Sequence, residues 1–148
     1  MTDGTVPIPA DRMHLINRTA DPKWSANPDG SGYRALIEVF HQLHCLDVIR
    51  QYTWRDYYPK HSDTVRVPFL LTPDNESVAR IHTDHCIEAL RLSLMCHGDT
   101  TPYLLEIDPK SPSGISPDFS MHHKCVKFEP LVEFMGKQKY QVESHNPH

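Results

Sequence analysis

The chain has 148 residues, a formal charge of −4 from 15 Lys and Arg against 19 Asp and Glu, and 39% hydrophobic residues. A single domain with its own core is expected at this length, and the mild acidity without a basic cluster argues against a nucleic-acid partner. No apolar stretch reaches the roughly 20 residues that cross a bilayer, so we predict a soluble chain without a membrane segment. Histidine is unusually frequent, with 11 residues, and the positions of these residues carry most of the functional argument.

The N-terminal region is rich in residues that interrupt helices. Four prolines and two glycines lie within the first thirty residues, which predicts an irregular arm. Apolar residues then recur at helical spacing, at Leu36, Phe40 and Leu43, and predict a first helix over residues 33–52. The chain is therefore expected to form a single domain over 1–148, with an arm over 1–30, a core over 31–135 and a polar tail over 136–148.

A second long helix is predicted after a polar linker. Thr72 and Pro73 supply a capping hydroxyl and a proline suited to the first helical turn, and Gly98 suits a left-handed C-terminal cap. Four prolines between residues 99 and 118 exclude a continuous helix there. They predict a long ordered loop with a short strand over 103–107.

The predicted fold class is mainly α. A last amphipathic stretch, over 126–135, indicates a short third helix. The domain is thus expected to consist of two long antiparallel helices, this short helix and long Pro-rich loops.

The two long predicted helices carry the same motif, HxxHC. The two copies are His41-Gln-Leu-His44-Cys45 and His82-Thr-Asp-His85-Cys86. Residues three and four apart share one helix face, so each copy presents two imidazoles and one sulfur to a single partner. One histidine at such a position is more often a hydrogen-bonded core residue, but the repetition is hard to obtain from core packing, which selects Leu and Ile. We predict that the four histidines bind metal, as one shared ion or two separate ones: His41, His44, His82 and His85.

The ligand types limit the choice of metal. Imidazole-rich sites without nearby carboxylates suit copper or zinc, whereas iron oxygenases usually combine two histidines with a carboxylate. Asp84 and Glu88 lie on the second helix and keep iron open as an alternative. Asp84 points well away from His82 on a straight helix, which weakens the case for iron.

The four cysteines have two interpretations, thiolate ligands in a reducing compartment or disulfides in an oxidising one. Cys86 and Cys96 are separated by about 15 Å along one helix, too far for a bridge. If the histidine pairs face each other, Cys45 also faces Cys86, which leaves Cys96 for Cys125. We favour this pairing, and the alternative joins Cys45 to Cys96 and Cys86 to Cys125.

Two further residues are candidates for a catalytic role. Asp99 follows the second helix closely enough to orient a ligand imidazole, although a turn or capping role is equally expected. His123 is a candidate fifth metal ligand, whereas its neighbour His122 is interpreted as a surface residue.

These motifs resemble those of the UstYa-like family of fungal oxidases. The matching stretches are residues 32–46 (GYRALIEVFHQLHCL), 82–96 (HTDHCIEALRLSLMC) and 123–128 (HKCVKF). Paired HxxHC motifs, a following LMC segment and a late HxC form a specific combination, and the resemblance covers roughly residues 24–135.

The resemblance implies a copper-dependent oxidoreductase that uses dioxygen as oxidant. Its expected role is the oxidative tailoring of a fungal secondary metabolite or a ribosomal peptide by cyclisation, hydroxylation, desaturation or halogenation. The family's metal role falls here on the four motif histidines. A small-molecule or peptide substrate is expected, as are homo- or hetero-oligomers with other family members.

Family members resemble single-pass membrane proteins whose catalytic domain faces the secretory lumen. Their anchoring hydrophobic helix is not found in this sequence, so we expect a lumenal or secreted domain of a longer, membrane-anchored form. Two other function classes stay open. One is a non-redox zinc or structural metal-binding domain, and the other is an inactive partner of another oxidase in the same pathway.

Overall fold

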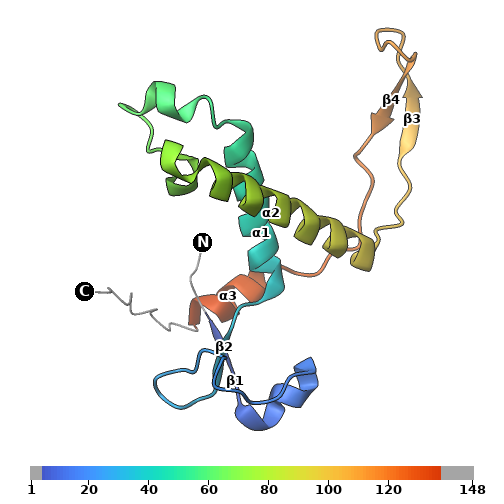
Figure 1. Ribbon diagram of the computed structural model, residues 1–148. Helices are drawn as coiled ribbons and strands as arrows, with labels where there is room; N and C mark the ends of the chain where they lie inside the picture. Colours follow the sequence, from blue (N-terminus) through green and yellow to red (C-terminus); the bar gives the residue numbers. More distant parts are fainter. Residues whose placement is uncertain (1–4, 138–148) are drawn as a thin grey trace.

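The structure is a computed structural model that describes residues 5–137 of the chain. Its main elements are three α-helices, α1 (Glu38–Thr53), α2 (Glu76–His97) and α3 (Glu129–Lys137) (Figure 1). Short 3-10 helices accompany them: η1 (Ala10–Ile16), η2 (Tyr58–His61), η3 (Phe69–Leu71) and η4 (Pro73–Asn75). Strands β1 (Val6–Ile8) and β2 (Tyr33–Ala35) form one antiparallel pair, and β3 (Leu104–Ile107) and β4 (Ile115–Asp118) form another. The prediction of a mainly α fold is confirmed, while most of the predicted polar tail lies outside the described residues.

Helices α1 and α2 cross each other and enclose the centre of the core. Cys45 and Cys86 are completely buried at the crossing, and Val48 is buried beside them. Ile49, Ala89 and Leu90 pack against this cluster. Figure 1 shows that the two helices cross obliquely and that their ends diverge. The last residue of each HxxHC motif thus holds the two helices together.

The first helix begins later than predicted. Residues 33–35 form β2, which pairs with β1 in the register Val6↔Ala35 and Ile8↔Tyr33. The predicted start of this helix at residue 33 was wrong, because a pairing with a segment some 25 residues earlier leaves no trace in local periodicity. The same pairing gives order to part of the arm that was predicted to be irregular.

Both ends of the second helical segment lie where they were predicted, but only the C-terminal cap forms as expected. Gly98 adopts a left-handed φ of 36° and donates its N–H to Leu94 O at 2.9 Å, as expected for a C-terminal cap. α2 itself starts at Glu76, but η4 leads directly into it, with Thr72 at the N-cap and Pro73 in the first turn, so the predicted start of the helical segment is confirmed and only the capping hydrogen bond is not. Thr72 Oγ1 donates back to Phe69 O at 2.9 Å, so its hydroxyl stabilises η3 instead of capping α2.

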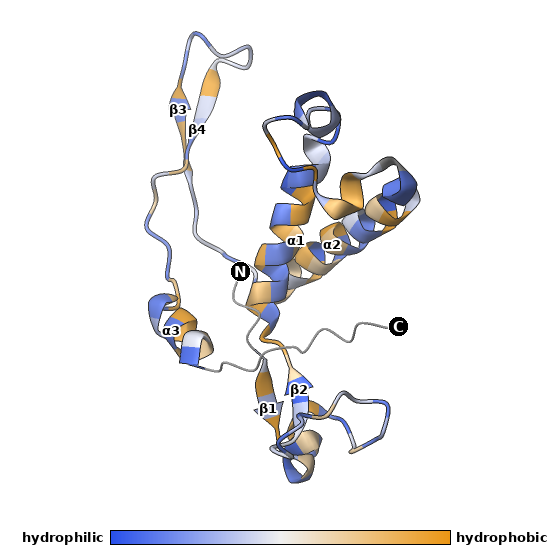
Figure 2. Cartoon of the chain, turned by 90° about the vertical axis from the view of Figure 1, so that its left-hand side faces the viewer, coloured by the Kyte–Doolittle hydropathy of each residue, from blue (hydrophilic) through white to orange (hydrophobic). Residues whose placement is uncertain are grey.

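The Pro-rich region after α2 forms a β-hairpin that projects away from the helices (Figure 1). Its first strand confirms the predicted short strand within one residue. Several large apolar side chains of this hairpin and of α2 are exposed, among them Ile81, Leu94 and Ile107. In Figure 2, apolar and polar residues alternate along α1 and α2, so neither helix is apolar all round. None of the described helices is long and apolar enough to cross a membrane.

Gly32 is required where the arm folds back onto β2. Its φ is 134°, and an added Cβ would overlap Ile8 O and lie 2.6 Å from Ile8 C. Gly32→Ala is therefore expected to lower the free energy of unfolding by about 2 kcal/mol, measured by denaturant titration. Gly30→Ala is the matched control, because Gly30 has a φ of 74° but open space around it, and its cost should be about 1 kcal/mol. Equal losses would show that the close approach to Ile8 is not what requires glycine.

Candidate metal centre

The two HxxHC motifs meet where α1 and α2 cross. The ring centres of His41 and His85 are 5.8 Å apart, and those of His44 and His82 are 5.6 Å apart. This pairing means that the two motifs run in opposite directions across the contact. The structure thus brings all four predicted ligand residues together, as two cross-helix pairs.

The spacing within each pair suits metal binding. Two imidazoles bound to one ion through bonds of about 2.0 Å place their ring centres roughly 5–6 Å apart, and both pairs have this separation. Within residues 5–137, no group of three or more His, Cys, Asp or Glu side chains forms a metal-binding cluster. The imidazole rings therefore approach one another as two pairs. Imidazole is a ligand that suits copper or zinc.

The carboxylates that kept iron open do not join these pairs. Glu88 forms an ion pair with Arg91 at 2.6 Å, and Asp84 is exposed. An iron site of two histidines and one carboxylate therefore gains no support from α2.

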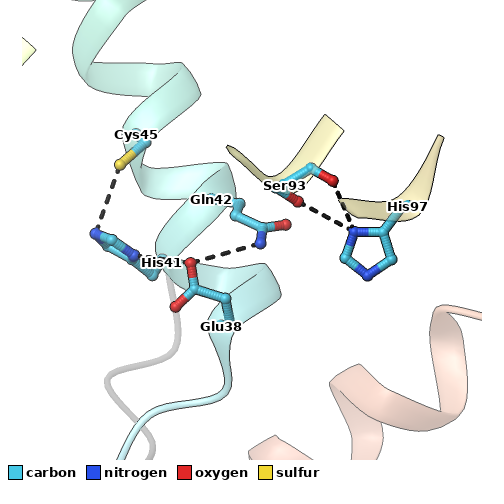
Figure 3. Close-up of polar contacts among 6 residues, drawn as sticks. All are labelled: Glu38, His41, Gln42, Cys45, Ser93 and His97. Carbon is cyan, nitrogen blue, oxygen red and sulfur yellow. Dashed lines mark hydrogen bonds and ion pairs between the residues drawn. The ribbon is translucent and has the colours of Figure 1, made fainter. Parts of the chain in front are cut away.

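His41 is held between a carboxylate and a thiol. Glu38 Oε1 lies 3.2 Å from His41 Nδ1, and Cys45 Sγ lies 3.5 Å from His41 Nε2 (Figure 3). When Nδ1 donates its proton to Glu38, Nε2 carries the lone pair, which accepts from the Cys45 thiol in this structure and is the group that would bind a metal. Sequence reasoning missed Glu38, although its position three residues before His41 on one helix was a usable signal.

The environment of His82 also favours the neutral imidazole. Burial lowers the pKa of His82, and the neighbouring His44, His85 and His41 lower it further because they disfavour another positive charge. A neutral ring needs no deprotonation before it binds a metal.

Burial raises the pKa of a cysteine thiol, whereas it lowers the pKa of a histidine. Burial raises the pKa of Cys86 to about 12, and its hydrogen bond with Cys45 adds to the shift. Cys86 is therefore protonated at neutral pH, and it would become a thiolate ligand only if a bound metal displaced its proton.

All four cysteines, each within the described residues, are free thiols. Cys45 faces Cys86 as predicted, since the two form a hydrogen bond, while Cys96 and Cys125 are exposed. The structure thus gives no support to the predicted disulfides, and the pairing stays a prediction.

Thiol counting distinguishes these cysteines experimentally. In the native, reduced protein at about pH 8, Cys96 and Cys125 should react quickly with Ellman's reagent. Cys45 and Cys86 should react only after denaturation, because both are fully buried and Cys86 is protonated. Four fast thiols would contradict the buried arrangement. A preparation purified without reductant that shows no reactive thiol even after denaturation would indicate two disulfides.

The two candidate catalytic residues contact each other. Asp99 Oδ2 lies 2.7 Å from His123 Nδ1, although 24 residues separate them in the chain. The backbone N–H of Thr101 binds Asp99 and is the main cause that lowers its pKa to about 2, with the Thr101 side chain and His123 contributing. The bond from Thr101 N–H to Asp99 is the turn role that was equally expected. Asp99 also binds an imidazole, that of His123, and its predicted role of orienting a metal ligand stays a prediction. No group of three or more His, Cys, Asp or Glu side chains within residues 5–137 could hold a metal ion, so the structure gives no support to His123 as a fifth metal ligand. The contact with Asp99 leaves Nε2 of His123 free to accept a proton.

This geometry defines a class of small, mainly α proteins in which paired histidines lie on two crossing helices. The chain belongs to the UstYa family, since the family model described as "Mycotoxin biosynthesis protein UstYa" matches residues 2–138. The family resemblance inferred from the motifs is therefore confirmed.

Several curated proteins are similar to this chain. "Transacylase cctO" of Talaromyces islandicus is 44% identical over 92% of this chain and 47% of its own length. "UstYa family oxidase phomYc" of Diaporthe leptostromiformis is 35% identical over 86% of this chain and 48% of its own. "Oxidase ustYa" of Aspergillus flavus is 32% identical over 68% of this chain and 40% of its own. The chain spans about half the length of the first two of these relatives, and no solved structure matches it.

Proposed function

We propose that this protein is a copper-dependent oxidoreductase that carries out oxidative tailoring of a fungal secondary metabolite or a ribosomal peptide, with dioxygen as oxidant. The observation that carries the proposal is the meeting of four imidazoles in two cross-helix pairs. Relatives that bear the name oxidase support the same reaction class. Cyclisation, hydroxylation, desaturation and halogenation all fall within it, and a secretory or secreted location completes the proposal.

The residues of the centre have distinct roles in this proposal. His41, His44, His82 and His85 hold the metal, which when bound supplies one-electron redox chemistry. Glu38 accepts the Nδ1 proton of His41 and fixes the orientation of that ring. The buried Cys45 and Cys86 keep the two helices in contact, which sets the distance between the imidazoles of each pair.

The experiment is metal analysis of the purified protein combined with electron paramagnetic resonance. Bound copper with nitrogen hyperfine structure from imidazole is expected. The control variant His97→Ala should keep the bound copper, because His97 lies on α2 outside the two histidine pairs. Its Nδ1 instead lies 2.9 Å from Ser93 O. Stoichiometric zinc in place of copper would support the non-redox metal-binding alternative and contradict the oxidoreductase.

A second candidate function, acyl transfer, is favoured by one observation. Asp99 fixes His123 with Nε2 free, so His123 is suited to accept the proton of an attacking hydroxyl or amine. The relative named a transacylase gives this reading further weight. Transfer from p-nitrophenyl acetate to an added amine should then persist when copper is chelated and fall in Asp99→Asn. Under the oxidoreductase proposal, Asp99→Asn leaves any such background rate unchanged.

A further inference from the structure

A cavity of about 760 Å³ lies between the start of α1 and the end of α2. Small-molecule sites in proteins typically have volumes of roughly 300–1,000 Å³. Figure 3 shows part of its walls, where Gln42 of α1 faces Ser93 and His97 of α2. Asp99 and Lys124 border it from the segments that follow α2 and precede α3.

The cavity borders both groups that could do chemistry. Glu38 lines it and also binds His41, with 3.2 Å between Oε1 and Nδ1. Asp99 lines it and also binds His123, with 2.7 Å between Oδ2 and Nδ1. A ligand in the cavity is therefore separated from His41 only by Glu38, and from His123 only by Asp99.

The charged side chains around the cavity differ in whether they have a hydrogen-bond or ion-pair partner. Both carboxylates that line the cavity accept hydrogen bonds. Glu38 accepts them from His41 and Gln42. Asp99 accepts them from Thr101 and His123. Lys124 is exposed and forms no ion pair or hydrogen bond with any residue of the described range 5–137. The unmet charge in the cavity is therefore an ammonium group, which attracts an anion.

The rest of the lining suits an amphipathic molecule. Val39, Leu94 and Val126 supply apolar surface. Gln42 and Ser93 supply an amide and a hydroxyl, both of which can bond the amide group of a ligand. The combination of an ammonium, apolar surface and amide-binding groups matches one end of a peptide.

We propose that this cavity binds the substrate of the proposed oxidoreductase through a free carboxylate of peptide type, with the carboxylate on Lys124 and an apolar side chain against Val39 and Leu94. The assignment of the ligand as substrate rests on the proposed function. The binding itself needs no metal, so it can be measured independently of copper.

The test uses N-acetyl-L-leucine and its uncharged analogue N-acetyl-L-leucinamide, each titrated into the metal-free, ¹⁵N-labelled 148-residue chain. The backbone amide signals of Val39, Leu94 and Thr100 should shift when N-acetyl-L-leucine is added. N-acetyl-L-leucinamide should bind about fivefold more weakly than N-acetyl-L-leucine. Lys124→Gln should weaken binding of the acid to the level of the amide, and Lys124→Arg should restore it.

Lys127→Gln is the matched control, because it removes the same charge three residues later from an exposed position that does not line the cavity. Shifts located elsewhere, equal binding of the two probes, or equal weakening by Lys124→Gln and Lys127→Gln would overturn the proposal. Copper titration of the same samples separates the two proposals. Probe binding without copper binding contradicts only the metal centre, and copper binding without probe binding contradicts only the cavity.

Discussion

Replacing one cross-helix histidine pair is expected to remove about half of the bound copper, whereas replacing both histidines of one helix removes nearly all of it. His41 faces His85, and His44 faces His82, so the double variant His41→Ala/His85→Ala leaves one pair intact. The variant His41→Ala/His44→Ala takes one imidazole from each pair and leaves neither complete. Copper content per chain by elemental analysis, together with the nitrogen hyperfine pattern, measures the difference.

Both double variants lose two imidazoles, so the comparison is matched for charge and composition. The expectation of two partly independent sites rests on the arrangement of the donors in pairs, without a cluster of three or more among residues 5–137. Equal copper loss in the two variants would instead show that all four imidazoles share one ion. Far-ultraviolet circular dichroism should be unchanged in both, because neither variant alters the buried core at Cys45, Val48 and Cys86.

The four metal-ligand candidates could be predicted because their signal is local. The i, i+3 spacing within each motif places both imidazoles on one helix face, and the repetition of the motif implied that the two faces meet. The same spacing relates Glu38 to His41, yet a glutamate near a helix start also suits the helix dipole, so its role could not be separated from that effect in the sequence.

Contacts between distant segments could not be predicted in this way. The pairing of β1 with β2 and the contact of Asp99 with His123 both depend on how the chain folds back on itself. Periodicity reports only which face of an element is apolar, and it does not say which other segment will cover that face. The sequence therefore named Asp99 and His123 separately, and only the structure joined them.

The state of the cysteines depends on more than the fold. The position of Cys45 and Cys86 in the motif predicted that they would face each other, and the structure places both in the core. Whether thiols at such positions form a disulfide depends on the redox potential of the compartment as well as on geometry. Cys45 and Cys86 can therefore help to hold α1 against α2 at this crossing either as two thiols or as a disulfide.

Glu38→Gln is expected to weaken copper affinity by about 10- to 100-fold, the usual effect of removing a carboxylate that orients a ligand imidazole. The substitution keeps the size of the side chain and an oxygen acceptor, but it removes the negative charge that makes His41 Nε2 more basic. The fold should be unaffected, because the Glu38 side chain is 66% exposed. Affinity is measured by competition with a chelator of known copper affinity.

Glu88→Gln provides the control for this experiment. Glu88 also forms an i, i+3 ion pair on its helix, but its partner is Arg91 and not a candidate ligand. It should therefore leave copper affinity unchanged while removing the same charge. If both variants weaken binding equally, the effect of Glu38 arises from the net charge of the protein, and its contact with His41 has no specific part in holding the metal. If only Glu38→Gln weakens binding, the metal lies within reach of His41 and the carboxylate controls the orientation of that ligand.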